Sequence, residues 1–186
     1  MWLRAIASGV LLACTVVRAA PPIRSVEAPK VGGTFTLTDA NGRRFASTNL
    51  AGKPYVLFFG YTFCPDICPT TLIQLAHLRH ALGPQGNAFT IVFVTVDPAR
   101  DTPAVLRRYA AAFNTPIVAL TGSEAEIDSV TRAFHVFVRR TQQRGGPDLI
   151  EHSSTPYLIG KDGAYRALLS GEEASDVALL RAAIRA

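Results

Sequence analysis

The sequence predicts one α/β domain, a central mixed β-sheet flanked by helices, with a β-hairpin at its N-terminal end. Short apolar runs, typical of strands buried on both faces, alternate with segments whose apolar residues recur at helical spacing. This alternation favours a mostly parallel sheet with an antiparallel edge. The length of 186 residues fits one domain, and no internal repeat is visible.

Composition excludes several classes of protein. With 48% hydrophobic and 18% charged residues, the chain is neither disordered, nor a coiled coil, nor collagen-like. No apolar run reaches the roughly 18 to 20 residues of a membrane-spanning helix. The formal net charge is +5, but the basic residues are scattered, so we expect no nucleic-acid partner.

The N-terminus resembles an export signal: a short positive start, an apolar stretch, and small residues suited to cleavage before Ala20. We therefore expect a signal peptide at residues 1–19, a flexible lead rich in alanine and proline at 20–33, and the folded domain at 34–186. The alternative is a lipoprotein leader that ends before Cys14, which would give the protein a lipid anchor. Both predict an exported protein.

The first elements of the domain are a hairpin and a buried strand. Residues 35–38 and the stretch around Phe45 flank Asp39-Ala40-Asn41-Gly42, a sequence typical of hairpin turns. Residues 55–59 are apolar throughout, which predicts a strand covered on both faces.

The middle of the chain repeats a strand–helix unit. A first helix is predicted by leucines at helical spacing, at positions 72, 75, 78 and 82. A strand at 89–96 precedes a second helix with Thr102 as its N-cap. A strand at 117–120 precedes a third helix that starts with a capping box of Ser123 and Glu126.

The last part of the chain predicts a loop, a second hairpin and a closing helix. Residues 139–147 are polar and contain glycines, so we expect a loop there. Residues 157–159 and 165–169 flank a turn at 161–163, and a helix is expected over 174–185.

The chemistry concentrates where the first buried strand meets the first helix, in Cys64-Pro65-Asp66-Ile67-Cys68-Pro69. After export these are the two remaining cysteines, and they would close too small a loop to stabilise the fold much as a disulfide. A helix N-terminus favours thiolates, and four-residue spacing on a first turn brings two sulfurs to one side. The pair can therefore form a reversible disulfide or hold a soft metal ion.

A third ligand would come from the histidines. His152 precedes the late strand, where loops at one end of a sheet converge, whereas His77 and His80 fit a solvated helix face and His135 a strand. The residues alone leave two classes open. One is a metal-binding protein; the other is a thiol–disulfide oxidoreductase or thiol peroxidase that acts through Cys64 and Cys68. Three residues between the cysteines instead of two argue against ordinary thioredoxin chemistry.

Four motifs together resemble the SCO/SenC family of thioredoxin-like copper chaperones. They occur in the family's order and spacing, at residues 59–72, 96–103, 120–122 and 151–153. The resemblance covers residues 30–185 and implies a thioredoxin-like fold. By position it implies that Cys64, Cys68 and His152 are copper ligands, and it is consistent with a reversible Cys64–Cys68 disulfide.

The resemblance also implies a role. A member would carry copper and would deliver it to the binuclear centre of cytochrome c oxidase or reduce the cysteines of that centre. Two thiolates and an imidazole suit Cu(I), and Cu(II) stays open as a second oxidation state. Its partners would be the copper-receiving subunit and a copper donor or thiol reductant. Members act in the periplasm or the mitochondrial intermembrane space. For this chain we expect the periplasm, with membrane attachment only through the alternative lipid at Cys14.

Two departures from the family pattern bear on the histidine. Gly160 stands where members usually have aspartate, and Pro156 stands at the start of the late strand. Because proline cannot donate to a ladder, that strand is expected to begin after Pro156, four residues beyond His152.

Four charged residues near the motifs are expected not to be ligands. Arg100 and Asp101 are expected to fix the loop as ionic partners, and Asp97 to cap a helix or form a turn. Asp66, between the cysteines, is expected to tune local charge or contact a partner.

Overall fold

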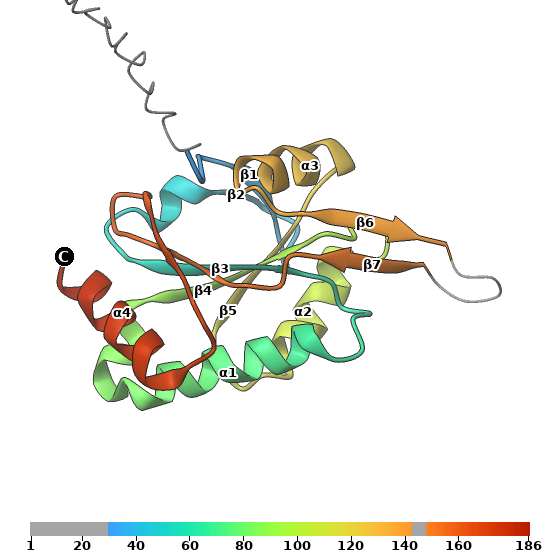
Figure 1. The fold of residues 1–186 in the computed structure, drawn as a ribbon. Helices are drawn as coiled ribbons and strands as arrows, with labels where there is room; N and C mark the ends of the chain where they lie inside the picture. Colours follow the sequence, from blue (N-terminus) through green and yellow to red (C-terminus); the bar gives the residue numbers. More distant parts are fainter. Residues whose placement is uncertain (1–29, 143–147) are drawn as a thin grey trace, which may run out of the picture.

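The structure is a computed structural model that describes residues 30–142 and 148–186 (Figure 1). The expected signal peptide, the alternative anchor at Cys14 and most of the expected lead lie outside these residues. Within the described ranges, no helix combines the length and apolar character needed to cross a membrane.

A seven-stranded mixed sheet forms the centre of the domain (Figure 1). In spatial order its strands are β2 (Arg44–Ala46), β1 (Thr36–Asp39), β5 (Ile117–Thr121), β4 (Thr90–Thr95), β3 (Tyr55–Gly60), β8 (Tyr157–Ile159) and β9 (Tyr165–Leu168). Strands β3, β4 and β5 pair in parallel, whereas every pairing outside them, on both sides of the sheet, is antiparallel. The expectation of a mostly parallel sheet with one antiparallel edge is wrong in this respect, because both hairpins add to the sheet.

Helices cover both faces of the sheet. They are α1 (Ile67–Ala81), α2 (Pro103–Ala111), α3 (Glu124–Ala133) and α4 (Glu173–Arg185). In Figure 1, α1, α2 and α4 lie on one side of the sheet and α3 on the other. Two short 3-10 helices, η1 (Ser47–Leu50) and η2 (Gly83–Ala88), were not predicted.

The apolar run that predicts β3 becomes the middle of the core, and all six of its residues are buried. Successive side chains point to opposite faces, so its two phenylalanines join separate aromatic clusters. Phe58 packs on Phe93, with ring centroids 6.0 Å apart. Phe59 packs on Phe134 and Tyr157 at 5.7 and 6.0 Å. Because β3 is held on both faces, the loop that follows it starts from a fixed point.

The start of α3 confirms the predicted capping box. The Glu126 N–H donates to Ser123 Oγ at 3.3 Å, and the Ser123 N–H donates to the Glu126 carboxylate at 2.8 Å. Thr102 likewise caps α2 through the N–H of Val105.

Replacing Ser123 with alanine removes one acceptor for the free amides of this helix start. We expect the free energy of unfolding to fall by about 1 kcal/mol, measured by urea denaturation. Ser129→Ala, on the exposed middle of α3, is the matched control and should lose no stability. Equal losses in the two variants would contradict the role of the cap.

A second, two-stranded sheet stands apart from the first. Strands β6 (Val138–Thr141) and β7 (Leu149–His152) form an antiparallel hairpin that projects from the domain (Figure 1). The loop expected at 139–147 is therefore wrong for its first residues, while 143–147 lie outside the described residues. Two histidine predictions change as well: His135 lies in a turn with φ +55°, not in a strand, and His152 ends β7 instead of lying in a loop.

Candidate metal centre

The two cysteines lie on either side of the start of α1. Because α1 begins at Ile67, with Asp66 at the N-cap position, only Cys68 is in its first turn and Cys64 belongs to the preceding loop. The expectation that both sulfurs share one helical turn is therefore wrong. They come together because the loop folds back: the Cys68 N–H faces Cys64 Sγ at 3.4 Å. Both are free thiols in the structure.

Cys68 is completely buried, and its sulfur packs against the backbone of Gly60 at the end of β3. A methyl group on Gly60 would lie 3.1 Å from Cys68 Sγ and 2.8 Å from Phe93 Cε2. Burial, assisted by the neighbouring Cys64, raises the pKa of the Cys68 thiol. This contradicts the expected thiolate at a helix N-terminus, because desolvation outweighs the helix dipole. A bound cation would supply the charge that ionises this thiol.

His152 completes the cluster from the end of β7. Its Nε2 lies 3.4 Å from Cys68 Sγ, and its Nδ1 lies 3.0 Å from the carbonyl oxygen of Ser153. A carbonyl only accepts, so Nδ1 carries the proton and Nε2 presents its lone pair to the sulfurs. Burial lowers the pKa of His152, which favours this neutral form. The Tyr61 ring packs edge-on against the imidazole, with centroids 5.9 Å apart.

The structure thus brings together the three residues that the sequence singled out. Ligand atoms of Cys64, Cys68 and His152 all lie within 4.8 Å of one another, the one such group in the described part of the chain. His77, His80 and His135 are exposed and do not belong to it. Two sulfurs and one imidazole form a soft, three-ligand set that suits Cu(I), whereas zinc prefers a fourth ligand.

Asp101 fixes the loop between β3 and Cys64. This buried carboxylate accepts from the Thr62 N–H at 3.0 Å, and from the hydroxyls of Thr62 and Thr95, both at 2.5 Å. Burial raises the pKa of Asp101, although these hydrogen bonds oppose the shift. The prediction that Asp101 is an ionic partner is wrong, because its partners are hydroxyls and an amide.

The neighbouring residues match their predictions more closely. Asp97 is a turn residue, since its carbonyl accepts from the N–H groups of Arg100 and Asp101. Arg100 forms the predicted ion pair, with the Asp97 carboxylate as its partner. Asp66 is exposed, and its side chain forms no capping hydrogen bond.

The two departures from the family pattern have local explanations. Strand β8 begins directly after Pro156, whose carbonyl accepts from the Leu169 N–H at 2.9 Å, so the proline starts the strand and His152 still faces Cys68. At Gly160 a side chain would meet the Arg166 guanidinium at 2.7 Å. Arg166 in turn pairs with Asp162 at 2.8 Å. The missing side chain thus makes room for this arginine.

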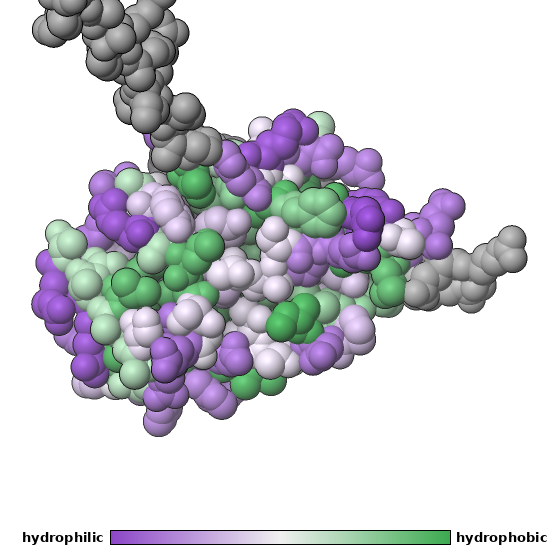
Figure 2. Space-filling model, in the orientation of Figure 1, coloured by the Kyte–Doolittle hydropathy of each residue, from purple (hydrophilic) through white to green (hydrophobic). Residues whose placement is uncertain are grey.

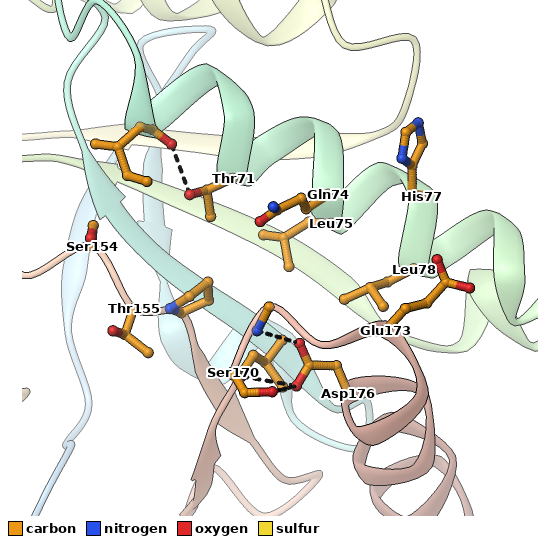
Figure 3. Close-up of a pocket in the computed structure, with 14 residues that line it drawn as sticks. Thr71, Gln74, Leu75, His77, Leu78, Ser154, Thr155, Ser170, Glu173 and Asp176 are labelled. Atoms are coloured by element: carbon orange, nitrogen blue, oxygen red, sulfur yellow. Dashed lines mark hydrogen bonds between the residues drawn. The ribbon is translucent and has the colours of Figure 1, made fainter.

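A cavity of about 380 Å³ lies between α1 and the segments 154–156 and 169–171 (Figure 3). One wall is α1, with Ile67, Thr71 and Leu75, and the opposite wall includes Ser154 and Thr155. Cys64, Cys68 and His152 do not line it, although Ile67 precedes Cys68 in sequence and Ser154 lies two residues after His152. Large exposed apolar side chains occur at Phe63, Ile67, Ile73, Phe137, Leu149 and Leu168. On the face shown in Figure 2, apolar patches are separated by polar ones.

Sequence reasoning missed several residues that shape the site. Gly60 and Tyr61 lie in a quoted motif, but only the fold shows that one accommodates Cys68 and the other packs on His152. Arg140, which reaches Asp97 at 3.2 Å, lies in a stretch predicted to be a loop. No sequence signal marked it, because its role depends on how the hairpin docks.

Comparison with known proteins supports the resemblance to the SCO/SenC family. The model of the SCO1/SenC family matches residues 24–185. A SCO2-like protein of Rickettsia prowazekii is 43% identical over 138 residues, which cover 73% of this chain and 67% of that protein. The mitochondrial SCO1 homologue 1 of Arabidopsis thaliana is 38% identical over 133 residues, which cover 71% of this chain but 40% of that longer protein.

Solved structures agree with the fold. ScoI of Bradyrhizobium japonicum, solved with copper bound, gives a TM-score of 0.77 at 34% identity, and the match covers 82% of this chain and 99% of that one. Yeast Sco1 with copper bound gives 0.77 at 32% identity, covering 85% and 90%. The fold is therefore thioredoxin-like, as the resemblance implies. Since the family model spans nearly the whole described domain and close relatives carry the same name, this chain belongs to the SCO1/SenC family.

Proposed function

We propose that this chain is a copper-binding accessory protein in which Cys64, Cys68 and His152 hold one copper ion. The observation that carries the proposal is the approach of His152 Nε2 to Cys68 Sγ at 3.4 Å, with Nδ1 held by a carbonyl. The copper-bound structures of its relatives from Bradyrhizobium japonicum and yeast support it.

The ligand chemistry favours Cu(I) as the main cargo, because thiolates are soft ligands. Three ligands leave a coordination position open, which a carrier needs in order to pass its ion to another set of ligands. The proposed recipient is the binuclear copper centre of cytochrome c oxidase, which the protein would load or whose cysteines it would reduce. A copper donor would then reload the protein with copper, or a thiol reductant would reduce its Cys64–Cys68 disulfide. Membership of the family supports this recipient, because BsSco is described as a member of the Sco family of cytochrome c oxidase assembly proteins.

The proposed site of action is the periplasm. The signal-like residues 1–19 support export, and residues 34–186 would form the exported copper-binding domain. The alternative leader would leave the same domain attached to a membrane through a lipid on Cys14.

A second candidate function is thiol–disulfide exchange with another protein. The two free thiols differ in accessibility, since Cys64 is half-buried and Cys68 fully buried. This asymmetry suits a pair in which Cys64 attacks and Cys68 resolves the mixed disulfide.

Copper uptake by the reduced and oxidised domain tests the copper function. We expect one copper per chain with the dithiol and none after oxidation to a Cys64–Cys68 disulfide, because metal ligation requires free thiolates. Metal analysis after desalting, with a count of free thiols, measures both. Equal copper uptake by the two forms would contradict the proposal. A copper-free domain that catalyses protein disulfide exchange would favour the second candidate.

A further inference from the structure

The hairpin that carries His152 has no backbone pairing with the main sheet. Among the described strands, β6 and β7 pair only with each other. Next to His152, the Ser153 N–H donates to the Phe137 carbonyl, and the Phe137 N–H donates to Ser153 Oγ, both at 3.0 Å. These bonds join the two strands of the hairpin. They do not fix the hairpin relative to the cysteines, which belong to the segment around the start of α1.

A buried carboxylate, that of Asp97, provides polar contacts between the hairpin and the main domain. Asp97 follows β4 and is 1% exposed. It accepts from Arg140 of β6 at 3.2 Å and also pairs with Arg100. Arg140 donates in addition to the Val96 carbonyl at 3.0 Å, and Arg100 donates to the carbonyl of Asp148, just before β7, at 3.1 Å. Both strands of the hairpin are thus tied to one short loop of the main domain.

Arg100 also reaches the site through aromatic rings. Its guanidinium carbon lies 5.0 Å from the centre of the Phe63 ring and 5.9 Å from that of Tyr61, which are distances at which cation–π attraction acts. The Tyr61 ring in turn packs against the imidazole of His152. The loop that anchors the hairpin therefore also supports the ring that faces the histidine.

We propose that Asp97, Arg100 and Arg140 are positioning residues for the copper site, which hold His152 over Cys68 without touching the metal. This inference rests on the proposed copper function, because the imidazole matters as a ligand. Without these ion pairs, the hairpin keeps its own pairing and its buried Ile150, but it loses the polar contacts that fix its orientation relative to α1. The sulfurs stay where they are, because β3, Gly60 and α1 hold them. Removing these residues should therefore change the position of the His152 imidazole and leave the two sulfurs in place.

The chain offers a matched pair of variants. Arg140 and Arg139 are neighbours on β6, but Arg139 pairs with Glu151 on the exposed face of the hairpin, with both side chains more than half exposed. The Arg140 side chain is 41% exposed, so Arg140→Ala should leave the domain folded, which a melting curve checks. Of the two substitutions, only Arg140→Ala removes an ion pair with Asp97.

Competition titration of the reduced domain against a Cu(I) chelator gives the first measurement. We expect Arg140→Ala to weaken affinity by about 10- to 100-fold, the range typical of partners that orient a metal ligand, and Arg139→Ala to leave it unchanged. In a His152→Ala background Arg140→Ala should have no further effect, because no imidazole remains to be placed. An equal loss in that background would overturn the proposal, since it would indicate general damage to the site.

The second measurement needs no copper. Proton NMR of the metal-free domain should show contacts between the His152 and Tyr61 rings, whose centroids are 5.9 Å apart, and Arg140→Ala should weaken these contacts. Arg140→Lys, which keeps a cation beside Asp97, should restore part of them. Ring contacts and copper affinity both unchanged in Arg140→Ala would overturn the proposal. If the wild-type domain bound no copper while the NMR responses appeared, the positioning would stand and the copper function would fail.

Discussion

The domain with Cys64 replaced by serine is expected to lose tight copper binding. Structural zinc sites in zinc-finger peptides gain about 10–16 kcal/mol on binding their ion, and a thiolate site of comparable strength would gain several kcal/mol from each ligand. Removing one of three ligands should weaken affinity by about 100-fold or more. Competition titration of the reduced variant against a Cu(I) chelator measures the loss.

Cys64 is the better of the two cysteines for this test. It is half-buried and lies outside α1, so a serine there should leave the fold intact. In Cys68→Ser the hydroxyl would be fully buried, and an unsatisfied polar group of this kind costs about 1–3 kcal/mol. His80→Ala, on the exposed face of α1, is the control and should bind copper as the wild type does. Wild-type affinity in Cys64→Ser would refute the three-ligand site.

Replacing Gly60 with alanine is expected to damage both the fold and the site. The new methyl carbon would lie 2.8 Å from Phe93 and 3.1 Å from the sulfur of Cys68. The Phe93 ring cannot retreat freely, because it is packed between Phe58 and Tyr109 at 6.0 and 5.6 Å. Overpacking of a core typically costs about 1–3 kcal/mol, so we expect a loss of that size by urea denaturation.

The same substitution should also weaken copper binding, because Cys68 is the other group that can shift. Gly33→Ala is the matched control: a methyl group there would have no neighbour within 4 Å, and its backbone lies outside the left-handed region. It should leave stability and copper affinity unchanged. If Gly60→Ala behaved like Gly33→Ala, the close packing of β3 against Cys68 would not be what places the sulfur.

The sequence predicts those elements whose formation depends on local pattern and burial. Strand β3 follows from an unbroken apolar run, and α3 from a serine and a glutamate at capping-box spacing. Strand β6 has neither signal. Three of its four residues are exposed, and the strand exists because it pairs with β7 and because Arg140 reaches a buried carboxylate. Tertiary contacts of this kind leave no periodic trace.

At the candidate site, too, the sequence predicts some properties and not others. The spacing of Cys64 and Cys68 predicts two neighbouring sulfurs, and they are neighbours. It does not predict their protonation. The helix dipole favours a thiolate, but the fold buries Cys68 completely, and the raised pKa of its thiol follows from that burial. For His152, loop position alone is weak evidence, and it was the family motif that singled it out.

The wide separation of the ligands in sequence has a consequence for biosynthesis. His152 and Cys68 are 84 residues apart, and β6, β7 and the loop around Asp97 must all be in place before they meet. A nascent or truncated chain that ends before β7 can offer copper only two thiols. A ligand that binds the folded state alone stabilises it in proportion to the logarithm of its concentration over its dissociation constant. Copper bound by all three ligands would therefore stabilise completely folded chains more than chains that lack His152.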